Sequence, residues 1–212
     1  MAKTEKFDGD LAFLFSKLKQ GLENVQQQRL ERLRDRLVAL HKANLVKINH
    51  SVMEMVCAKH LILKDYEVDV EHPLEGGLTC DLFATKGYGS FIVEIETGFI
   101  PPEHALDPSG YIEARIASKI VRYSSQAGKF ALGIPPHYVL QFPETFILPP
   151  KKREEKELTT IKGFCDLYYQ NPPVTLEEVR NARLHVVYVV DVDNAQVREL
   201  NPDDYLKNKA VL

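Results

Sequence analysis

Residues 79–84 and 91–97 are separated by a Gly-Tyr-Gly-Ser turn, a pattern that predicts a β-hairpin. The first stretch carries Asp81, and the second carries Glu94 and Glu96. Because side chains alternate between the two faces of a strand, Glu94 and Glu96 share one face. Asp81 reaches the same place if it lies near the end of the antiparallel partner strand. Three close carboxylates repel one another unless a cation lies between them, so the hairpin predicts a Mg²⁺ or Mn²⁺ site.

A second interpretation is that Glu94 and Glu96 form the solvent-exposed face of a half-buried strand. The run 90–97 is dense in apolar and β-branched residues. This composition favours a central strand that is buried on both faces, where unpaired acids would be costly. We therefore favour the metal site.

Residues 51–136 resemble the PD-(D/E)XK nuclease superfamily, the restriction-endonuclease-like fold, in their motif and in the order helix, strand, strand, strand, helix, strand. In that superfamily an aspartate opens the second strand, an acid-x-lysine motif follows on the third, and a glutamate often projects from the first helix. Asp81, Glu94 and Glu54 match these three positions. Glu96 stands where the lysine is expected, and no proline precedes Asp81. Length and pattern are also similar to those of the small nuclease-like proteins of spindle-shaped archaeal viruses.

The resemblance implies an α/β fold with a mixed central β-sheet flanked by helices. It also implies that Asp81, Glu94 and Glu54 bind Mg²⁺ or Mn²⁺, with the main-chain carbonyl of Ile95 as a further ligand. Glu96 would help to position the attacking water. The activity implied is metal-dependent endonucleolytic cleavage of DNA, either duplex or branched as in a flap or a junction.

The missing lysine is expected from the next helix. Over residues 110–127, apolar residues recur at intervals of three and four, which predicts an amphipathic helix. Lys119 on its polar side would orient and activate the water, while Arg115, Arg122 and Gln126 would hold phosphate oxygens. The alternative is that these residues form an ordinary solvated face.

His50 precedes Glu54 by one helical turn, so the two side chains could share a site. A lone histidine in a helix is more often a surface or capping residue, and this is the interpretation we favour for His50.

The charges of the chain are distributed unevenly. The whole sequence has a formal net charge of -3, but residues 66–110 hold nine acids and one lysine, a net -8, which leaves the remainder at +5. An acidic centre framed by basic segments suits a metal-dependent nuclease. A structural metal-binding module would share the acidic centre but would not need the basic frame.

Residues 1–48 are predicted to be a helical extension of an α/β domain that comprises residues 49–212. Within residues 26–42 a narrow leucine seam repeats at three and four, formed by Leu30, Leu33, Leu37 and Leu40. The seam has two interpretations, which are packing against the chain's own core and a homodimer interface.

Several other classes of protein lack their sequence signals here. No apolar run approaches the roughly 18 residues that span a membrane, and no signal peptide opens the chain, which predicts a cytoplasmic protein, or one in the host cytoplasm if it is viral. The three scattered cysteines predict reduced thiols. No glycine-rich phosphate loop or dinucleotide fingerprint is present, so no nucleotide cofactor is expected.

Two alternatives to a DNA endonuclease stay open from the sequence. Glu96 in the lysine position favours a catalytically weak or inactive DNA-binding or assembly protein that retains the fold. An RNA nuclease would use the same residues, and the sequence does not distinguish the two substrates.

Overall fold

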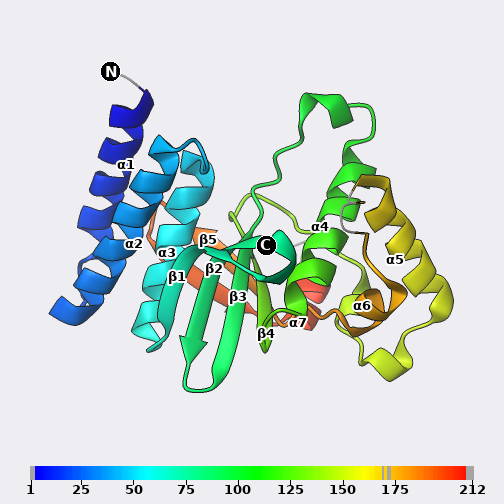
Figure 1. The fold of residues 1–212 in the computed structure, drawn as a ribbon. Helices are drawn as coiled ribbons and strands as arrows, with labels where there is room; N and C mark the ends of the chain where they lie inside the picture. Colours follow the sequence, from blue (N-terminus) through cyan, green and yellow to red (C-terminus); the bar gives the residue numbers. More distant parts are fainter. Residues whose placement is uncertain (1–2, 169, 171–172, 209–212) are drawn as a thin grey trace.

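The computed structural model describes residues 3–168, 170 and 173–208. In this part of the chain a six-stranded mixed β-sheet is flanked by seven α-helices (Figure 1), so the predicted α/β class is confirmed. The strands are β1 (Glu67–Pro73), β2 (Thr79–Lys86), β3 (Gly89–Ile95), β4 (Lys129–Ile134), β5 (Val186–Asp191) and β6 (Gln196–Leu200). The helices are α1 (Lys3–Leu18), α2 (Asn24–Lys42), α3 (Ile48–Leu63), α4 (Pro108–Ser124), α5 (Glu155–Tyr168), α6 (Leu176–Asn181) and α7 (Pro202–Asn208).

The order of strands in the sheet follows the chain, from β1 at one edge to β6 at the other. The pairs β1–β2, β2–β3 and β5–β6 are antiparallel, whereas β3–β4 and β4–β5 are parallel. A parallel pair needs a crossover connection, and α4 provides it between β3 and β4. Strand β3 therefore lies between the antiparallel hairpin and the parallel part of the sheet.

Strand β3 is buried on both faces, as its apolar sequence predicts. Val93 and Ile95 belong to the core formed with α1, α2 and α3, whereas Ile92 belongs to the core formed with α4 and α5. Glu94 and Glu96 are only 3% and 1% exposed. The interpretation of these two acids as a solvent-exposed strand face is therefore wrong.

Helices α1, α2 and α3 form a layer on one side of the sheet, and α4 and α5 lie on the other (Figure 1). The leucine seam of α2 is buried in the first of these layers, with Leu30, Leu33 and Leu37 at 0%, 7% and 0% exposure. A fully buried leucine contributes roughly 1.5–3 kcal/mol. The seam thus packs against the chain's own core. It offers no exposed apolar surface for a homodimer, and the homodimer stays a prediction.

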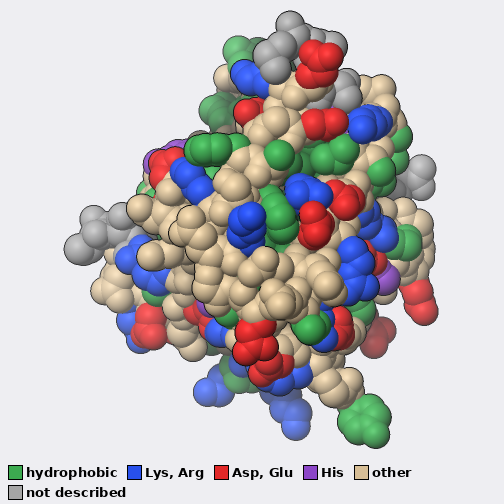
Figure 2. Space-filling model, turned by 90° about the vertical axis from the view of Figure 1, so that its left-hand side faces the viewer, with side chains coloured by type: hydrophobic (Ala, Val, Ile, Leu, Met, Phe, Trp, Pro, Cys, Tyr) green, Lys and Arg blue, Asp and Glu red, His purple; other side chains and the backbone are tan. Residues whose placement is uncertain are grey.

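The first 48 residues do not have a core of their own, because α1 and α2 share one hydrophobic cluster with α3 and the sheet. On the face that α1 and α2 present to solvent, Lys and Arg side chains are interspersed with Asp and Glu side chains (Figure 2). The excess positive charge predicted outside the centre is therefore not gathered into one broad basic patch on this face.

The charged run of residues 151–157 leads into helix α5. The helix begins at Glu155 and continues to Tyr168. Leu158, Ile161 and Cys165, which are spaced by three and four, are buried against the sheet side of the molecule. This buried stripe is hard to recognise in the sequence, because a run of charged residues precedes it. Among the described helices, none combines the length and hydrophobicity needed to cross a bilayer.

Candidate metal site

The strands β2 and β3 part at the place where the predicted acids lie. Their pairing runs from Lys86↔Gly89 to Leu82↔Val93. Beyond that pair, the N–H of Asp81 donates to Oε1 of Glu94 at 3.0 Å, and the N–H of Ile95 donates to Oδ2 of Asp81 at 2.5 Å. We call this place, formed by Asp81, Glu94 and Ile95, the fork. Side-chain carboxylates replace the backbone ladder here, which fixes both acids between the strands.

Helix α4 delivers Lys119 into the fork. Its Nζ donates to the carbonyl of Ile95 at 2.6 Å and lies 3.2 Å from Oε2 of Glu94 and 3.9 Å from Oδ2 of Asp81. The helix begins with Pro108 after Asp107, whose carboxylate accepts the N–H of Gly110 as an N-terminal cap. The structure therefore places the ammonium of Lys119 beside Glu94 and Asp81.

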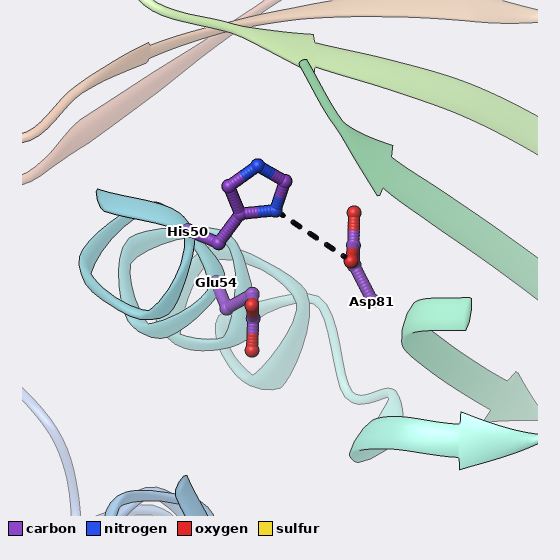
Figure 3. A group of neighbouring side chains, drawn as sticks. All are labelled: His50, Glu54 and Asp81. Atoms are coloured by element: carbon purple, nitrogen blue, oxygen red, sulfur yellow. Dashed lines mark ion pairs between the residues drawn. The ribbon is translucent and has the colours of Figure 1, made fainter. Parts of the chain in front are cut away.

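Helix α3 contributes His50 and Glu54 from the other side of the sheet (Figure 3). His50 Nδ1 lies 3.8 Å from Oδ1 of Asp81, and one potential ligand atom from each of these three residues lies within 4.8 Å of the others. Glu54 is 0% exposed, and neither of its carboxylate oxygens has a hydrogen-bond partner among the described residues. A fully buried carboxylate without a partner is costly. A cation held by the three residues would remove this cost.

Two buried acids of the site, Glu54 and Glu94, have raised pKa values. Burial raises the pKa of Glu54 well above its usual value, and the charge of Asp81 adds to the rise. Burial and then Asp81 raise the pKa of Glu94 to about 8, although Lys119 opposes the rise. Cation binding requires deprotonated ligands, so it would release protons from this site.

The pKa values of Asp81 and Lys119 shift in the directions that favour the charged form of each side chain. Burial acts to raise the pKa of Asp81, but Lys119 and His50 outweigh it, and the pKa is lowered. Burial acts to lower the pKa of Lys119, but Glu94 and Asp81 outweigh it, and this pKa is raised. The pKa of Asp81 is thus shifted in the opposite direction from those of Glu54 and Glu94.

Glu96 shares the α4 side of the sheet with Glu94, as predicted, and its carboxylate is already bound. Oε1 accepts the N–H of Gly98 at 2.9 Å, and Oε2 lies 2.9 Å from Nε of Arg115. Arg115 also donates to the carbonyl of Phe99 at 3.3 Å. The pair formed by Glu96 and Arg115 thus ties the segment after β3 to α4, and the predicted roles of these residues toward water and phosphate stay predictions.

The prediction that Gln126 lies on the helix with Lys119 is wrong, because α4 ends at Ser124 instead of continuing to residue 127. Gln126 lies in the turn that leads to Gly128, whose N–H donates to Ser90 Oγ at 3.0 Å. Ser90 is at the end of β3 opposite the fork. The structure therefore places Gln126 away from the site.

Arg122 lies on α4 but on the side that faces α5. Burial raises the pKa of Cys165 in α5, and the positive charge of Arg122 opposes that rise. Arg122 follows Lys119 by three residues on the same helix. Its predicted contact with phosphate stays a prediction.

Sequence reasoning missed Glu71 of β1 and underestimated His50. Glu71 lies opposite Asp81 in the β1–β2 ladder, between the pairs Val70↔Leu82 and His72↔Cys80. The antiparallel register would have revealed this position, but the register is set by the turn between the strands, and that turn was not predicted. The signal for His50 was its spacing of four residues from Glu54.

The donor set fits a divalent cation. Asp81, Glu54 and His50 converge, and Glu54 has two buried oxygens that need a positive partner. Carboxylate oxygens suit Mg²⁺ and Mn²⁺, and an imidazole nitrogen suits a transition-metal ion. The carbonyl of Ile95, predicted as a further ligand, accepts its hydrogen bond from Lys119 in this structure.

Comparisons with known proteins give little further information. No family model matches the chain, and no curated protein matches it. One solved structure to which the chain is similar is a CdiA-CT/CdiI toxin and immunity complex from Burkholderia pseudomallei. The identity is 15% over 73% of this chain and 86% of that chain, and the TM-score is 0.29. This similarity is too weak to support an inference about fold or function.

Proposed function

We propose that this protein is a metal-dependent endonuclease that cleaves phosphodiester bonds in DNA. The observation that carries the proposal is the position of Lys119 Nζ, 3.2 Å from Oε2 of Glu94 and 3.9 Å from Oδ2 of Asp81. Two acids at the end of a hairpin with a lysine between them match the PD-(D/E)XK arrangement, although here the lysine comes from α4 and Glu96 takes its usual place on the strand. We therefore propose that the chain is a variant of that superfamily.

Asp81, Glu54 and His50 would hold the cation. When bound, Mg²⁺ or Mn²⁺ lowers the pKa of a coordinated water and stabilises negative charge on the scissile phosphate. The imidazole of His50 favours Mn²⁺, because Mg²⁺ binds oxygen ligands almost exclusively. Glu94 would act in its present position, where its Oε1 accepts the N–H of Asp81 and so fixes the main chain of that ligand.

Lys119 supplies positive charge at the reacting centre. Its Nζ is fixed by two acceptors, Glu94 and the Ile95 carbonyl, and its side chain is 15% exposed. An ammonium held in this way can orient the attacking water and bind a non-bridging phosphate oxygen without reorganising. The buried pair of Glu96 and Arg115 maintains the distance between β3 and α4 on which this geometry depends.

The substrate would approach from the side of His50 and Asp81, whose side chains are 27% and 14% exposed, compared with 4% for Glu94. The test is cleavage of labelled linear, flapped and four-way-junction DNA, with a single-stranded RNA beside them, in Mg²⁺ or Mn²⁺ and in EDTA. We expect cutting that needs the metal and is lost in Glu94→Gln. The matched control is Glu177→Gln, an exposed acid on α6, which should cut like the wild type. Cutting by Glu94→Gln at the wild-type rate would contradict the proposal.

A second candidate is a DNA-binding or assembly protein that keeps the fold without catalysis. Two contacts favour this candidate, because they occupy groups that the nuclease would use. Lys119 donates a hydrogen bond to the Ile95 carbonyl, and Arg115 forms an ion pair with Glu96. Calorimetric titration with Mn²⁺ separates the two functions. An inactive scaffold has no reason to bind Mn²⁺ with an affinity that Asp81→Asn abolishes, whereas the nuclease does.

A further inference from the structure

Glu71 belongs to β1, a strand that supplies none of the residues assigned so far to the metal site. In the register of β1 and β2 it lies between Val70, which pairs with Leu82, and His72, which pairs with Cys80, and so across from Asp81. Arg36 of α2 donates from Nη2 to the carbonyl of Glu71 at 3.0 Å, and its Nη1 lies 3.2 Å from Oδ1 of Asp69. The backbone of Glu71 is thus held by a helix that does not otherwise contact the fork.

The backbone of Glu71 is in an unusual conformation for a residue inside a strand. Its φ is 47°, in the left-handed region that favours glycine. A glutamate at such a position strains the backbone. Glycine would adopt this conformation more readily, so the fold alone does not account for a carboxylate here.

The carboxylate of Glu71 interacts with charged groups from three other elements of the site. Burial and the charge of Asp81 raise its pKa to about 7, while His50 and Lys119 oppose the rise. Glu71 in turn contributes to the raised pKa of Glu54. These effects agree with the position of Glu71 across from Asp81 in the register of β1 and β2.

Independently of Glu71, the cluster shows a need for a cation. Glu54 is fully buried, both of its oxygens lack partners among the described residues, and it lies beside His50 and Asp81 (Figure 3). The ligand atoms within 4.8 Å of one another come from His50, Glu54 and Asp81, and Glu71 is outside this group. Mg²⁺ and Mn²⁺ keep several waters when they bind to proteins, and acids around such a site hydrogen-bond those waters.

We propose that Glu71 is an outer ligand of the cation held by His50, Glu54 and Asp81, hydrogen-bonding a water of the cation's coordination shell, and that Arg36 positions it. The inference rests on the metal site of the proposed function, but it does not require that the protein cleave nucleic acid. Loss of such an outer partner typically weakens metal binding 10–100-fold.

The test compares Mn²⁺ affinity and metal-free stability in Glu71→Gly, Glu71→Gln and the wild type, by calorimetry and by urea unfolding in EDTA. Ala195→Gly is the matched control, because Ala195 also has a positive φ, 54°, and lies next to β6, outside the site. We expect both Glu71 variants to bind Mn²⁺ about 10–100-fold more weakly. Glu71→Gly should nevertheless unfold at a higher urea concentration than the wild type. Ala195→Gly should also gain stability and should keep its Mn²⁺ affinity.

Unchanged Mn²⁺ affinity in Glu71→Gly and Glu71→Gln would overturn the inference and leave the nuclease proposal intact. Failure of the nuclease proposal alone would give a different result. Wild-type protein that binds Mn²⁺ in a manner dependent on Glu71, but cuts no nucleic acid, would refute the nuclease and support the inference. Wild-type protein that binds no Mn²⁺ would overturn both.

Discussion

Replacing Glu54 by methionine should stabilise the metal-free protein while abolishing its response to metal. Glu54 is 0% exposed, and its two carboxylate oxygens have no hydrogen-bond partner among the described residues. An unsatisfied buried polar group costs roughly 1–3 kcal/mol. Methionine has a similar length and no polar oxygen, so we expect a gain of about 2 kcal/mol, which is about 4–8 °C in Tm for a chain of this size.

With metal present, the order of stability should reverse. A ligand at a hundredfold excess over its Kd stabilises a protein by about 2.7 kcal/mol. The wild type should gain this amount from Mn²⁺, and Glu54→Met should gain nothing. Both proteins are unfolded thermally in EDTA and in Mn²⁺. Ser51→Ala is the matched control, because Ser51 is also fully buried on α3 with an unpartnered oxygen, and it should keep the Mn²⁺ response. A Glu54→Met protein that is less stable than the wild type in EDTA would refute the reasoning.

Three further predictions follow from the site. Lys119→Met should slow cleavage by about 100-fold or more. It should also destabilise the fold by about 3 kcal/mol, measured by urea unfolding, because Glu94 loses its buried partner. Cleavage at the wild-type rate would contradict the proposed role of Lys119. In EDTA, the free energy of unfolding should fall as the pH rises from about 4.5 to 8. The reason is that the pKa values of Glu71 (about 7) and Glu94 (about 8) are raised, so the folded state holds protons that the unfolded chain has lost. Urea midpoints that rise across this range would contradict the prediction. Gly98→Ala should lower the free energy of unfolding by about 2 kcal/mol more than Gly21→Ala does. Both glycines have a positive φ, but only at Gly98 would a Cβ lie 2.5 Å from a tyrosine ring. Equal urea midpoints for the two variants would contradict the prediction.

The parts of the fold that the sequence predicts are those whose signals are local. The buried strand β3 is visible in its apolar composition, and α2 in its leucine seam. Strand β6 was not predicted, because only Val197 and Leu200 among its residues are apolar and the strand pairs with β5 at the edge of the sheet.

The positions of Glu94 and Lys119 could be predicted because they depend on strand alternation and helix periodicity, whereas their roles in a site stay predictions. Those two periodicities place Glu94 on the α4 side and bring Lys119 toward it. The contributions of His50 and Glu71 depend instead on how α3 crosses the sheet and on the register of β1 against β2. Both are set by tertiary packing, which no short stretch of sequence encodes. Gln126 was misplaced for a related reason, since the apolar rhythm of α4 continues by chance past its last helical residue.

The measurement that tests the central claim most directly is the single-turnover cleavage of labelled DNA by the wild type and by Asp81→Asn, in Mn²⁺ and in EDTA, with circular dichroism to show that both are folded. Asp81 is the acid that contacts both the α3 and the α4 side of the site. The account predicts cutting by the wild type in Mn²⁺, none in EDTA, and a loss of at least about 100-fold in Asp81→Asn. Equal rates for the two folded proteins, or cutting that persists in EDTA, would contradict it.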